Sequence, residues 1–262
     1  MDKPFFTPEP VVFSVMGGVK NLPPETEDAV RAGFDSGADV ACVNVQLSGD
    51  KVVMVITPES LESVCGNGGA VAEYTAEELK KFDAAYMFRD EEGECSFRGK
   101  GYSFMTLREL LETFPDKKFN VTLLGKGEEL VRAYAGTVKS CGAEDRVLTS
   151  SANGKNISLA RRLLPGSATS FSLAGIFGVY ALFRSGLLFF KTGFDADVLQ
   201  TPEAIGVSYI ANSGLIREMH KRSVRVYVWN VNDRQQYLRL TEAGADGFMS
   251  DDVPALKGFM VE

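Results

Sequence analysis

The chain has 262 residues, of which 45% are hydrophobic and 24% are charged. This composition is typical of a folded globular protein and excludes wholesale disorder, and about 250 residues is the usual size of a single α/β barrel. The 28 Lys and Arg against 35 Asp and Glu give a net charge of -7. Such an acidic balance argues against a protein that binds nucleic acids through their phosphate backbone.

Histidine and cysteine, two residue types common in catalytic and metal sites, are scarce in this chain. The chain has a single histidine, His220, so neither a pair of imidazoles acting as acid and base nor a His-rich zinc site can form within it. The four cysteines have no C-x-x-C spacing, which is typical of a reduced compartment. No run of 18 apolar residues occurs and the Pro-rich start does not resemble a signal peptide, so we expect no membrane span and a cytoplasmic protein.

Short β-branched runs alternate with amphipathic stretches, a pattern that predicts a parallel sheet with crossover helices. We expect strands at 11–15, 40–45, 119–124, 146–150, 168–172, 198–200, 224–231 and 247–250. We expect helices at 25–36, 106–114, 128–140, 157–164, within 174–183, and at 213–222 and 233–243. Eight strands with alternating helices predict a (β/α)8 TIM barrel, made by one domain over residues 1–262.

The segment after the second strand departs from this alternation. The runs 40–45 and 52–56 are too close for a parallel crossover, so they predict an antiparallel hairpin. Residues 58–105 then read as an insertion, with a helix near 75–82 that begins at a Thr-Ala-Glu-Glu capping signal. Its aromatic residues could form an interface between copies of the chain; they are Phe82, Tyr86, Phe88, Phe97, Tyr102 and Phe104.

Several segments resemble the glycerophosphodiester phosphodiesterase family. GADVACVNVQL (37–47) is similar to that family's G-A-D-x-I-E-x-D-V-Q-L, and 48–58 is similar to its K-D-G-x-x-V-V-x-H-D-P. YTAEELKKFDA (74–84), VRVYVWNVND (224–233) and GADGFMSDDVP (244–254) also resemble its motifs, in the same order. The resemblance covers about 11–256 and implies a TIM barrel whose site lies at the carboxyl ends of the strands.

The resemblance also implies a site with one Mg²⁺ or Ca²⁺ ion on carboxylates and two histidines as acid and base. Carried over by position, the family's His-Arg-Gly turn reads Met16, Gly17 and Gly18 in this chain. The other matching positions also hold residues without the family's chemistry; they are Cys42, Asn44, Ile56, Thr57, Thr122 and Leu124. We therefore expect no metal, no cofactor and no catalytic residue at these positions, because neutral side chains offset neither a cation nor a phosphodiester.

Neutral polar groups remain at the predicted strand ends, beside one tryptophan. They are Asn44, Thr57, Thr122, Ser150, Trp229 and Asn232. Trp229 would either form a wall of a pocket or simply pack in the core. If the pocket binds a ligand, we expect a small neutral polyol, since no fixed cation offsets the desolvation of an anion.

Three hypotheses about function follow. The first is a catalytically inactive family member that serves as a binding or interaction module. The second is an enzyme, either a phosphodiesterase of glycerophosphodiesters with a rebuilt site or another hydrolase on the same barrel. The third is a structural protein that forms homo-oligomers through the insertion.

Overall fold

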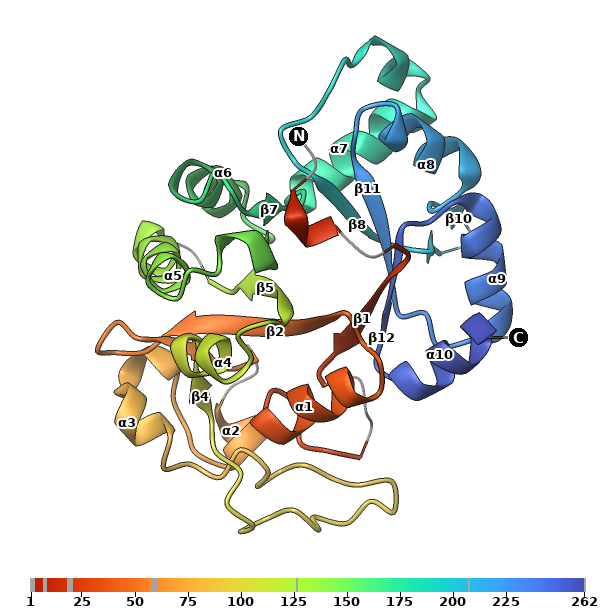
Figure 1. The fold of residues 1–262 in the computed structure, drawn as a ribbon. Helices are drawn as coiled ribbons and strands as arrows, with labels where there is room; N and C mark the ends of the chain where they lie inside the picture. The colour runs from red at the N-terminus through yellow and green to blue at the C-terminus, as the bar shows by residue number, and fades with distance from the viewer. Residues whose placement is uncertain are drawn as a thin grey trace.

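A computed structural model describes residues 3–6, 9–17, 21–57, 61–125, 127–206 and 208–261. Within these residues, eight parallel strands form a nearly closed barrel in the order β7-β6-β5-β2-β1-β12-β11-β8, with helices around the outside (Figure 1). The predicted (β/α)8 barrel is confirmed. Gly18 and the start of the predicted insertion (58–60) lie outside the described residues.

The strands and helices of the barrel alternate along the chain. The strands are β1 (Val11–Val15), β2 (Val40–Leu47), β5 (Lys118–Leu123), β6 (Val147–Ser150), β7 (Ala168–Thr169), β8 (Val198–Pro202), β11 (Arg225–Trp229) and β12 (Gly247–Ser250). The helices are α1 (Glu27–Asp35), α4 (Leu107–Thr113), α5 (Glu128–Ser140), α6 (Gly154–Leu163), α7 (Leu173–Arg184), α8 (Ser213–His220), α9 (Arg234–Ala243) and α10 (Val253–Val261). The sequence had not predicted α10, and β11 is shorter than the expected strand 224–231.

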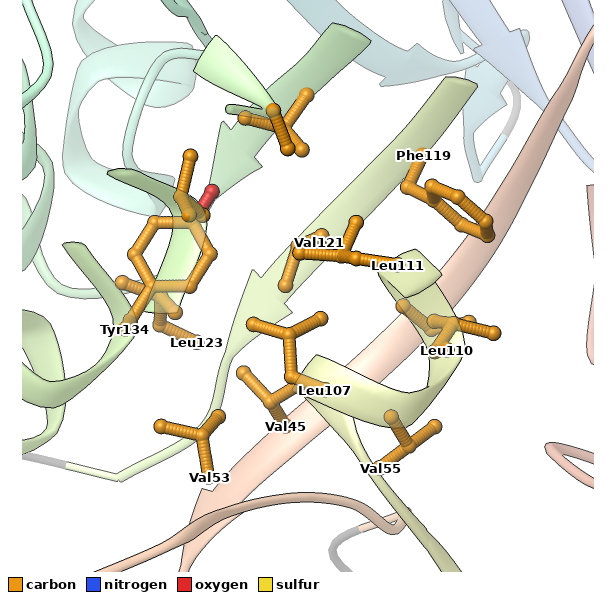
Figure 2. Close-up of a cluster of buried hydrophobic side chains, with 14 of the residues drawn as sticks. Val45, Val53, Val55, Leu107, Leu110, Leu111, Phe119, Val121, Leu123 and Tyr134 are labelled. Carbon is orange, nitrogen blue, oxygen red and sulfur yellow. The ribbon is translucent and has the colours of Figure 1, made fainter. Parts of the chain in front are cut away.

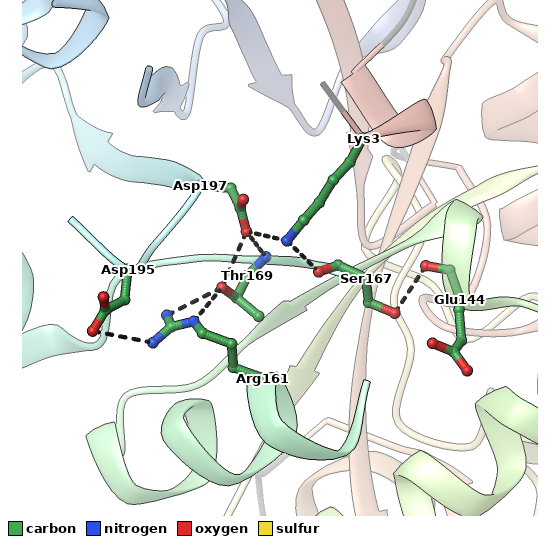
Figure 3. Close-up of polar contacts among 7 residues, drawn as sticks. All are labelled: Lys3, Glu144, Arg161, Ser167, Thr169, Asp195 and Asp197. Carbon is green, nitrogen blue, oxygen red and sulfur yellow. Dashed lines mark hydrogen bonds and ion pairs between the residues drawn. The ribbon is translucent and has the colours of Figure 1, made fainter. Parts of the chain in front are cut away.

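Side chains support the seam between β7 and β8, where the backbone contributes one bridge, Ser170 to Val198. One carboxylate oxygen of Asp197 accepts hydrogen bonds from the backbone nitrogen of Thr169, at 2.8 Å, and from Nζ of Lys3, at 2.9 Å. Arg161 donates to the hydroxyl of Thr169 from the other side (Figure 3). These contacts link the last pair of strands, so the barrel closes although β7 is only two residues long.

The hydrophobic core has an inner and an outer layer. Inside the barrel, Phe13 and Tyr227 pack ring against ring with centroids 4.7 Å apart. The short 3-10 helix η1 (Pro4–Phe6) buries Phe5 and Phe6 in this inner cluster, at the amino ends of the strands. The outer layer lies between the strands and the surrounding helices. On the side of α4 and α5 it is mainly aliphatic, with Phe119 and Tyr134 among its aromatic members (Figure 2). A second outer cluster packs α7, α8, α9 and α10 against the barrel.

The chain leaves the barrel after β2 and returns at α4. β3 (Val53–Val55) pairs antiparallel with β2, as predicted for the hairpin, and β4 (Met105–Thr106) pairs antiparallel with β3. Between them lie α2 (Leu61–Cys65), η2 (Val71–Glu73) and α3 (Ala76–Leu79), and α3 begins with the expected capping box of Thr75 and Glu78.

This segment has a small core of its own, built around Met54, Ile56 and Leu79. Of the six aromatic residues expected to form an interface, Phe104 is buried there, and Phe82 and Tyr102 are partly buried against the cluster. These three side chains therefore contribute to the core of the segment.

Three short elements complete the described structure. They are η3 (Glu144–Arg146) before β6, η4 (Leu187–Phe190) after α7, and a hairpin of β9 (Ala204–Ile205) and β10 (Ser208–Tyr209).

Candidate functional site

A cavity of about 350 Å³ opens at the carboxyl ends of the barrel strands. This is the end of a TIM barrel at which binding and catalytic residues collect. The described lining residues are Val15, Met16, Cys42, Asn44, Asn120, Thr122, Ser150, Ser151, Ala152, Ser170, Phe171, Leu173, Ile176, Gln200, Trp229, Asn230 and Met249. None of them is Asp, Glu, Lys, Arg or His, so the described part of the cavity wall carries no formal charge.

Three predicted site residues lie side by side on neighbouring strands. Asn44 of β2 is in register with Thr122 of β5, and Thr122 is in register with Ser150 of β6. All three line the cavity. They form a short row of neutral donors and acceptors that face the same space, which suits hydroxyl or amide groups of a ligand.

A second polar layer lies deeper in the barrel. The hydroxyl of Ser150 lies 2.8 Å from Oδ1 of Asn120 and 3.2 Å from Oε1 of Gln200, both of which are buried. The side-chain nitrogen of Gln200 has no hydrogen-bond partner among the described residues. A buried donor without a partner is costly, so this nitrogen is available to a molecule that enters the cavity. Neither Asn120 nor Gln200 was among the residues predicted from the sequence.

Cys42 lies on the cavity wall next to this network. Nδ2 of Asn120 donates to its sulfur at 3.5 Å. Burial raises the pKa of the Cys42 thiol to about 12, because desolvation disfavours the thiolate more than this hydrogen bond favours it. The thiol is therefore protonated at neutral pH and is not an activated nucleophile.

The turn after β1 is held tightly against α1. Met16 and Gly17 both have positive φ, 53° and 97°, and Met16 is 48% exposed at the rim of the cavity. A Cβ atom at Gly17 would lie 2.6 Å from Cβ of Ala29, and one at Gly33 would lie 2.4 Å from the carbonyl oxygen of Gly17. The turn thus leaves no room for a side chain at Gly17.

Trp229 ends β11, is half-buried and lines the cavity. Trp229 also packs against the inner core cluster. Its side chain therefore serves both as a wall of the cavity and as part of the core, the two roles that the sequence left open. Asn232 is exposed, and its Oδ1 accepts a hydrogen bond of 2.6 Å from the hydroxyl of Ser250. It is not among the lining residues.

The remaining predicted positions lie beside the cavity and do not line it. Ile56 is fully buried in the small core of the segment that follows β3, and Leu124 donates its backbone N–H to the carbonyl oxygen of Val45 at 3.0 Å. Thr57 donates its hydroxyl to the carboxylate of Glu25.

Glu25 is a buried carboxylate that the sequence did not reveal. Its Oε1 accepts the backbone N–H of Asn44 at 2.9 Å, and its side chain is 5% exposed. Burial raises its pKa above the usual range in spite of the hydrogen bonds from Thr57 and Asn44. Glu25 was not among the residues predicted from the sequence, and it is not among the residues that line the cavity.

The single histidine lies far from this chemistry. His220 ends α8, and its Nε2 lies 2.8 Å from Oδ2 of Asp246, just before the start of β12. The amino ends of the strands are at the opposite end of the barrel from the cavity. His220 thus cannot contact a molecule bound there.

Within the part of the chain that the structure describes, no three His, Cys, Asp or Glu side chains converge in a way that could hold a metal ion. No described helix has both the length and the apolar character needed to cross a membrane.

The fold and the position of the cavity define the protein as a TIM-barrel protein with its site at the carboxyl end of the strands. The model of the glycerophosphoryl diester phosphodiesterase family matches residues 17–255, and the chain belongs to this family.

Relatives match over nearly the full length. A glycerophosphodiester phosphodiesterase of Caldanaerobacter subterraneus is 26% identical, with 94% of this chain and 96% of the relative covered. The barrel is similar to the glycerophosphoryl diester phosphodiesterase domain of an uncharacterized protein from Mycobacterium tuberculosis, with a TM-score of 0.86, 18% identity and coverage of 97% and 100%. It is also similar to a phosphodiesterase of Oleispira antarctica in complex with the product sn-glycerol-3-phosphate, with a TM-score of 0.78, 20% identity and coverage of 97% and 98%.

Proposed function

We propose that this chain is a catalytically inactive family member whose barrel binds a small, uncharged, hydroxyl-rich molecule. The observation that carries the proposal is the absence of any charged residue among the described residues that line the cavity. Phosphodiester cleavage needs proton transfer, typically worth about 10²–10⁴ in rate, and charge stabilisation, worth about 10²–10³ for a single donor. Neutral amides and hydroxyls supply neither at the required strength.

The metal site is the first part of this argument. In the family's pattern, Cys42, Asn44, Thr57 and Thr122 stand where the metal ligands or their neighbours would be. Mg²⁺ and Ca²⁺ bind mainly to carboxylate oxygens, and these four residues bring no charge. The carboxylate that contacts two of these residues, Glu25, is hydrogen-bonded to Asn44 and Thr57 and is not among the residues that line the cavity. The residues present therefore do not fit a divalent cation, and we propose that none is bound.

The acid, the base and the phosphate-binding cation are the second part. In the family's pattern they correspond to Met16, Gly17 and Ile56. Met16 and Ile56 cannot transfer protons, and a glycine at φ 97° packed against Ala29 cannot be replaced by arginine without rebuilding the turn. The backbone has thus adapted to the lack of a side chain at this position, as expected of a site no longer used for catalysis.

A neutral ligand agrees with the groups that remain. Asn44, Thr122 and Ser150 present a row of donors and acceptors, and the unpartnered nitrogen of Gln200 adds a donor below them. Trp229 supplies a flat apolar face of the kind against which polyols and sugars pack.

The names of the relatives favour a second function, the hydrolysis of glycerophosphodiesters or of another ester by a rebuilt site. The relative from Caldanaerobacter is named a phosphodiesterase, and the structure from Oleispira contains the product sn-glycerol-3-phosphate. Family membership by itself supports this function better than it supports inactivity. The uncharged cavity is what favours the first proposal.

Hydrolysis of glycerophosphocholine and glycerophosphoethanolamine, with and without Mg²⁺, Ca²⁺ or Mn²⁺, separates the two functions. The relative from Caldanaerobacter serves as the positive control, and product release by this chain should equal that of buffer. Calorimetry should show no binding of these metals at submillimolar concentration. Turnover of about one per second, a modest rate for an enzyme, that is abolished by a chelator would establish the second function.

A further inference from the structure

Helix α7 and the following 3-10 helix η4 carry an unusual concentration of exposed apolar side chains. Five of the eleven large hydrophobic residues that are exposed in the described part of the chain lie in this stretch. They are Leu173, Phe177, Leu187, Phe189 and Phe190, at 49%, 53%, 52%, 79% and 76% exposure. We call these five residues the apolar ridge. The chain that follows α7 forms the edge of the molecule at the top of Figure 1.

The solvent-facing side of α7 is apolar as well as its inner side. Along α7, the exposed positions recur with helical period and hold Leu173, Phe177 and Ala181, with Arg184 as the first charge. The inner face is also apolar, since Val179 is buried and Ile176 and Phe183 pack against the core. A surface helix of a barrel is normally amphipathic, and a helix that is apolar on all sides is normally covered.

The end of the ridge is held in place by a buried arginine. Arg222 of the α8 C-terminus donates to the carbonyl oxygens of Leu188, at 2.6 Å, and Lys191, at 2.7 Å. Its guanidinium is paired with Glu218 and its side chain is 6% exposed. Leu188 is buried, while Phe189 and Phe190 project outward with ring centroids 5.6 Å apart. Hydrogen bonds from Arg222 therefore hold the backbone of this segment in place while the two rings remain exposed.

Basic residues flank the ridge. From Arg146 to Phe194 the chain has six Lys or Arg and no Asp or Glu. The acidic residues near this stretch are Asp195, which follows it directly, and Glu218, which is paired with Arg222. Arg184 and Lys191 flank η4, are both exposed and form no ion pair within the described residues. Salt screens charges beyond about 8 Å, so a surface that touches the ridge meets mainly these cations.

We propose that the apolar ridge docks this protein onto the surface of a bilayer that contains anionic lipids. Aromatic and aliphatic side chains flanked by Lys and Arg are the composition of segments that lie in the membrane interface. No described helix can cross a bilayer, so the contact is peripheral. A second copy of the chain fits less well, because a two-fold contact through the ridge would bring the Arg184 and Lys191 of both copies into one interface.

Docking in this way brings the cavity to the membrane. Leu173 and Ile176 of α7 line the cavity, and Leu173 also belongs to the apolar ridge. With α7 along the bilayer, the mouth of the cavity lies at the level of the lipid headgroups. The docking proposal does not depend on the function proposed above, since it concerns the outer face of α7.

Flotation of the full chain with vesicles tests the proposal. We expect binding to vesicles of phosphatidylcholine with about 30% phosphatidylglycerol, weaker binding to phosphatidylcholine alone, and loss of the difference at high salt. The double variant F189S/F190S should bind about tenfold less, because it removes two inserted aromatic rings. The variant R184E/K191E should lose the preference for anionic vesicles. All of these residues are exposed, so thermal melting should be unchanged.

The control is L238S/V261S, which removes two exposed apolar residues from α9 and α10 at 46% and 89% exposure. It should float like the wild type. Absence of binding to both kinds of vesicle, or equal binding by F189S/F190S and the wild type, would overturn the proposal. A dimer in light scattering that F189S/F190S abolishes, without vesicle binding, would assign the ridge to a second copy of the chain instead.

Discussion

Oε1 of Glu25 lies 2.9 Å from the backbone nitrogen of Asn44, so a buried carboxylate supports the loop-facing end of β2 directly behind a residue of the cavity. Glu25 has a φ of 60°, and this left-handed backbone directs its side chain inward just before α1 begins. The carboxylate also accepts the hydroxyl of Thr57 and so joins β2 to the strand-end segment after β3. Glu25 therefore links the turn before α1 to β2 and to the segment that follows β3.

The raised pKa of Glu25 makes stability depend on pH. Because burial holds the folded-state pKa above the unfolded value, the folded protein binds more protons between the two, and stability falls as pH rises through that window. Glu25→Gln keeps an acceptor for Asn44 and does not titrate. We expect E25Q to unfold at a higher temperature than the wild type at pH 8 and the difference to shrink on acidification.

The control for this prediction is Glu27→Gln in the first turn of α1, two residues after Glu25, at an exposed residue paired with Arg31. Exposed ion pairs contribute little, so E27Q should follow the wild type at every pH. A variant E25Q that is less stable than the wild type at pH 8 would contradict the prediction. It would mean that the hydrogen bonds of the ionised carboxylate stabilise the fold by more than its desolvation destabilises it.

Restoring carboxylates to the cavity should destabilise the protein. In the double variant C42E/N44D, two carboxylates face a wall without cations, and the second lies close to Glu25. We expect a loss of about 1–3 kcal/mol relative to Cys42→Gln, which has the size of the glutamate without its charge. Denaturant melts at pH 7 measure the difference. Equal stability of the two variants would mean that the cavity is well hydrated.

The sequence predicts the barrel well because its strands are short β-branched runs separated by amphipathic helices. The runs at 11–15 and 247–250 match β1 and β12 residue for residue, and the hairpin of β2 and β3 follows from a connection too short for a crossover. Helix α10 was missed because it is apolar without a clear periodicity, as is α7.

The site is predictable only in part, because side-chain direction depends on tertiary contacts. The row of Asn44, Thr122 and Ser150 could be foreseen, since parallel strands bring equivalent ends together. The inward turn of Glu25 and the contact of Gln200 with Ser150 could not, because they join residues far apart in the sequence through a local backbone conformation and a barrel register. The exposure of one side of α7 could not be predicted either, because its apolar sequence has the same pattern as that of a buried helix.

The turn after β1 should not accept a side chain at Gly17. A residue other than glycine at φ 97° is strained, and its Cβ would lie 2.6 Å from that of Ala29. We expect Gly17→Ala and Gly17→Arg each to lose about 1–3 kcal/mol of stability. Met16→His, at an exposed neighbouring position, is the control and should change stability by less than about 0.5 kcal/mol. Wild-type melting of G17R would show that the turn can rearrange to carry an arginine.

Ligand binding in the cavity can be followed through Trp229, the only tryptophan of the chain. Titration with glycerol or inositol should shift its emission, whereas glycerol 3-phosphate should have a smaller effect, because no lining residue offsets the desolvation of a phosphate. Thr122→Val keeps the shape of the wall and removes one hydroxyl, so it should weaken the response to the polyols by about two- to tenfold, the value of one hydrogen bond. Ser158→Ala, on the exposed face of α6, should leave the titration unchanged. A stronger response to glycerol 3-phosphate than to the neutral polyols would mean that a cation reaches the cavity, and would favour phosphodiester hydrolysis over binding.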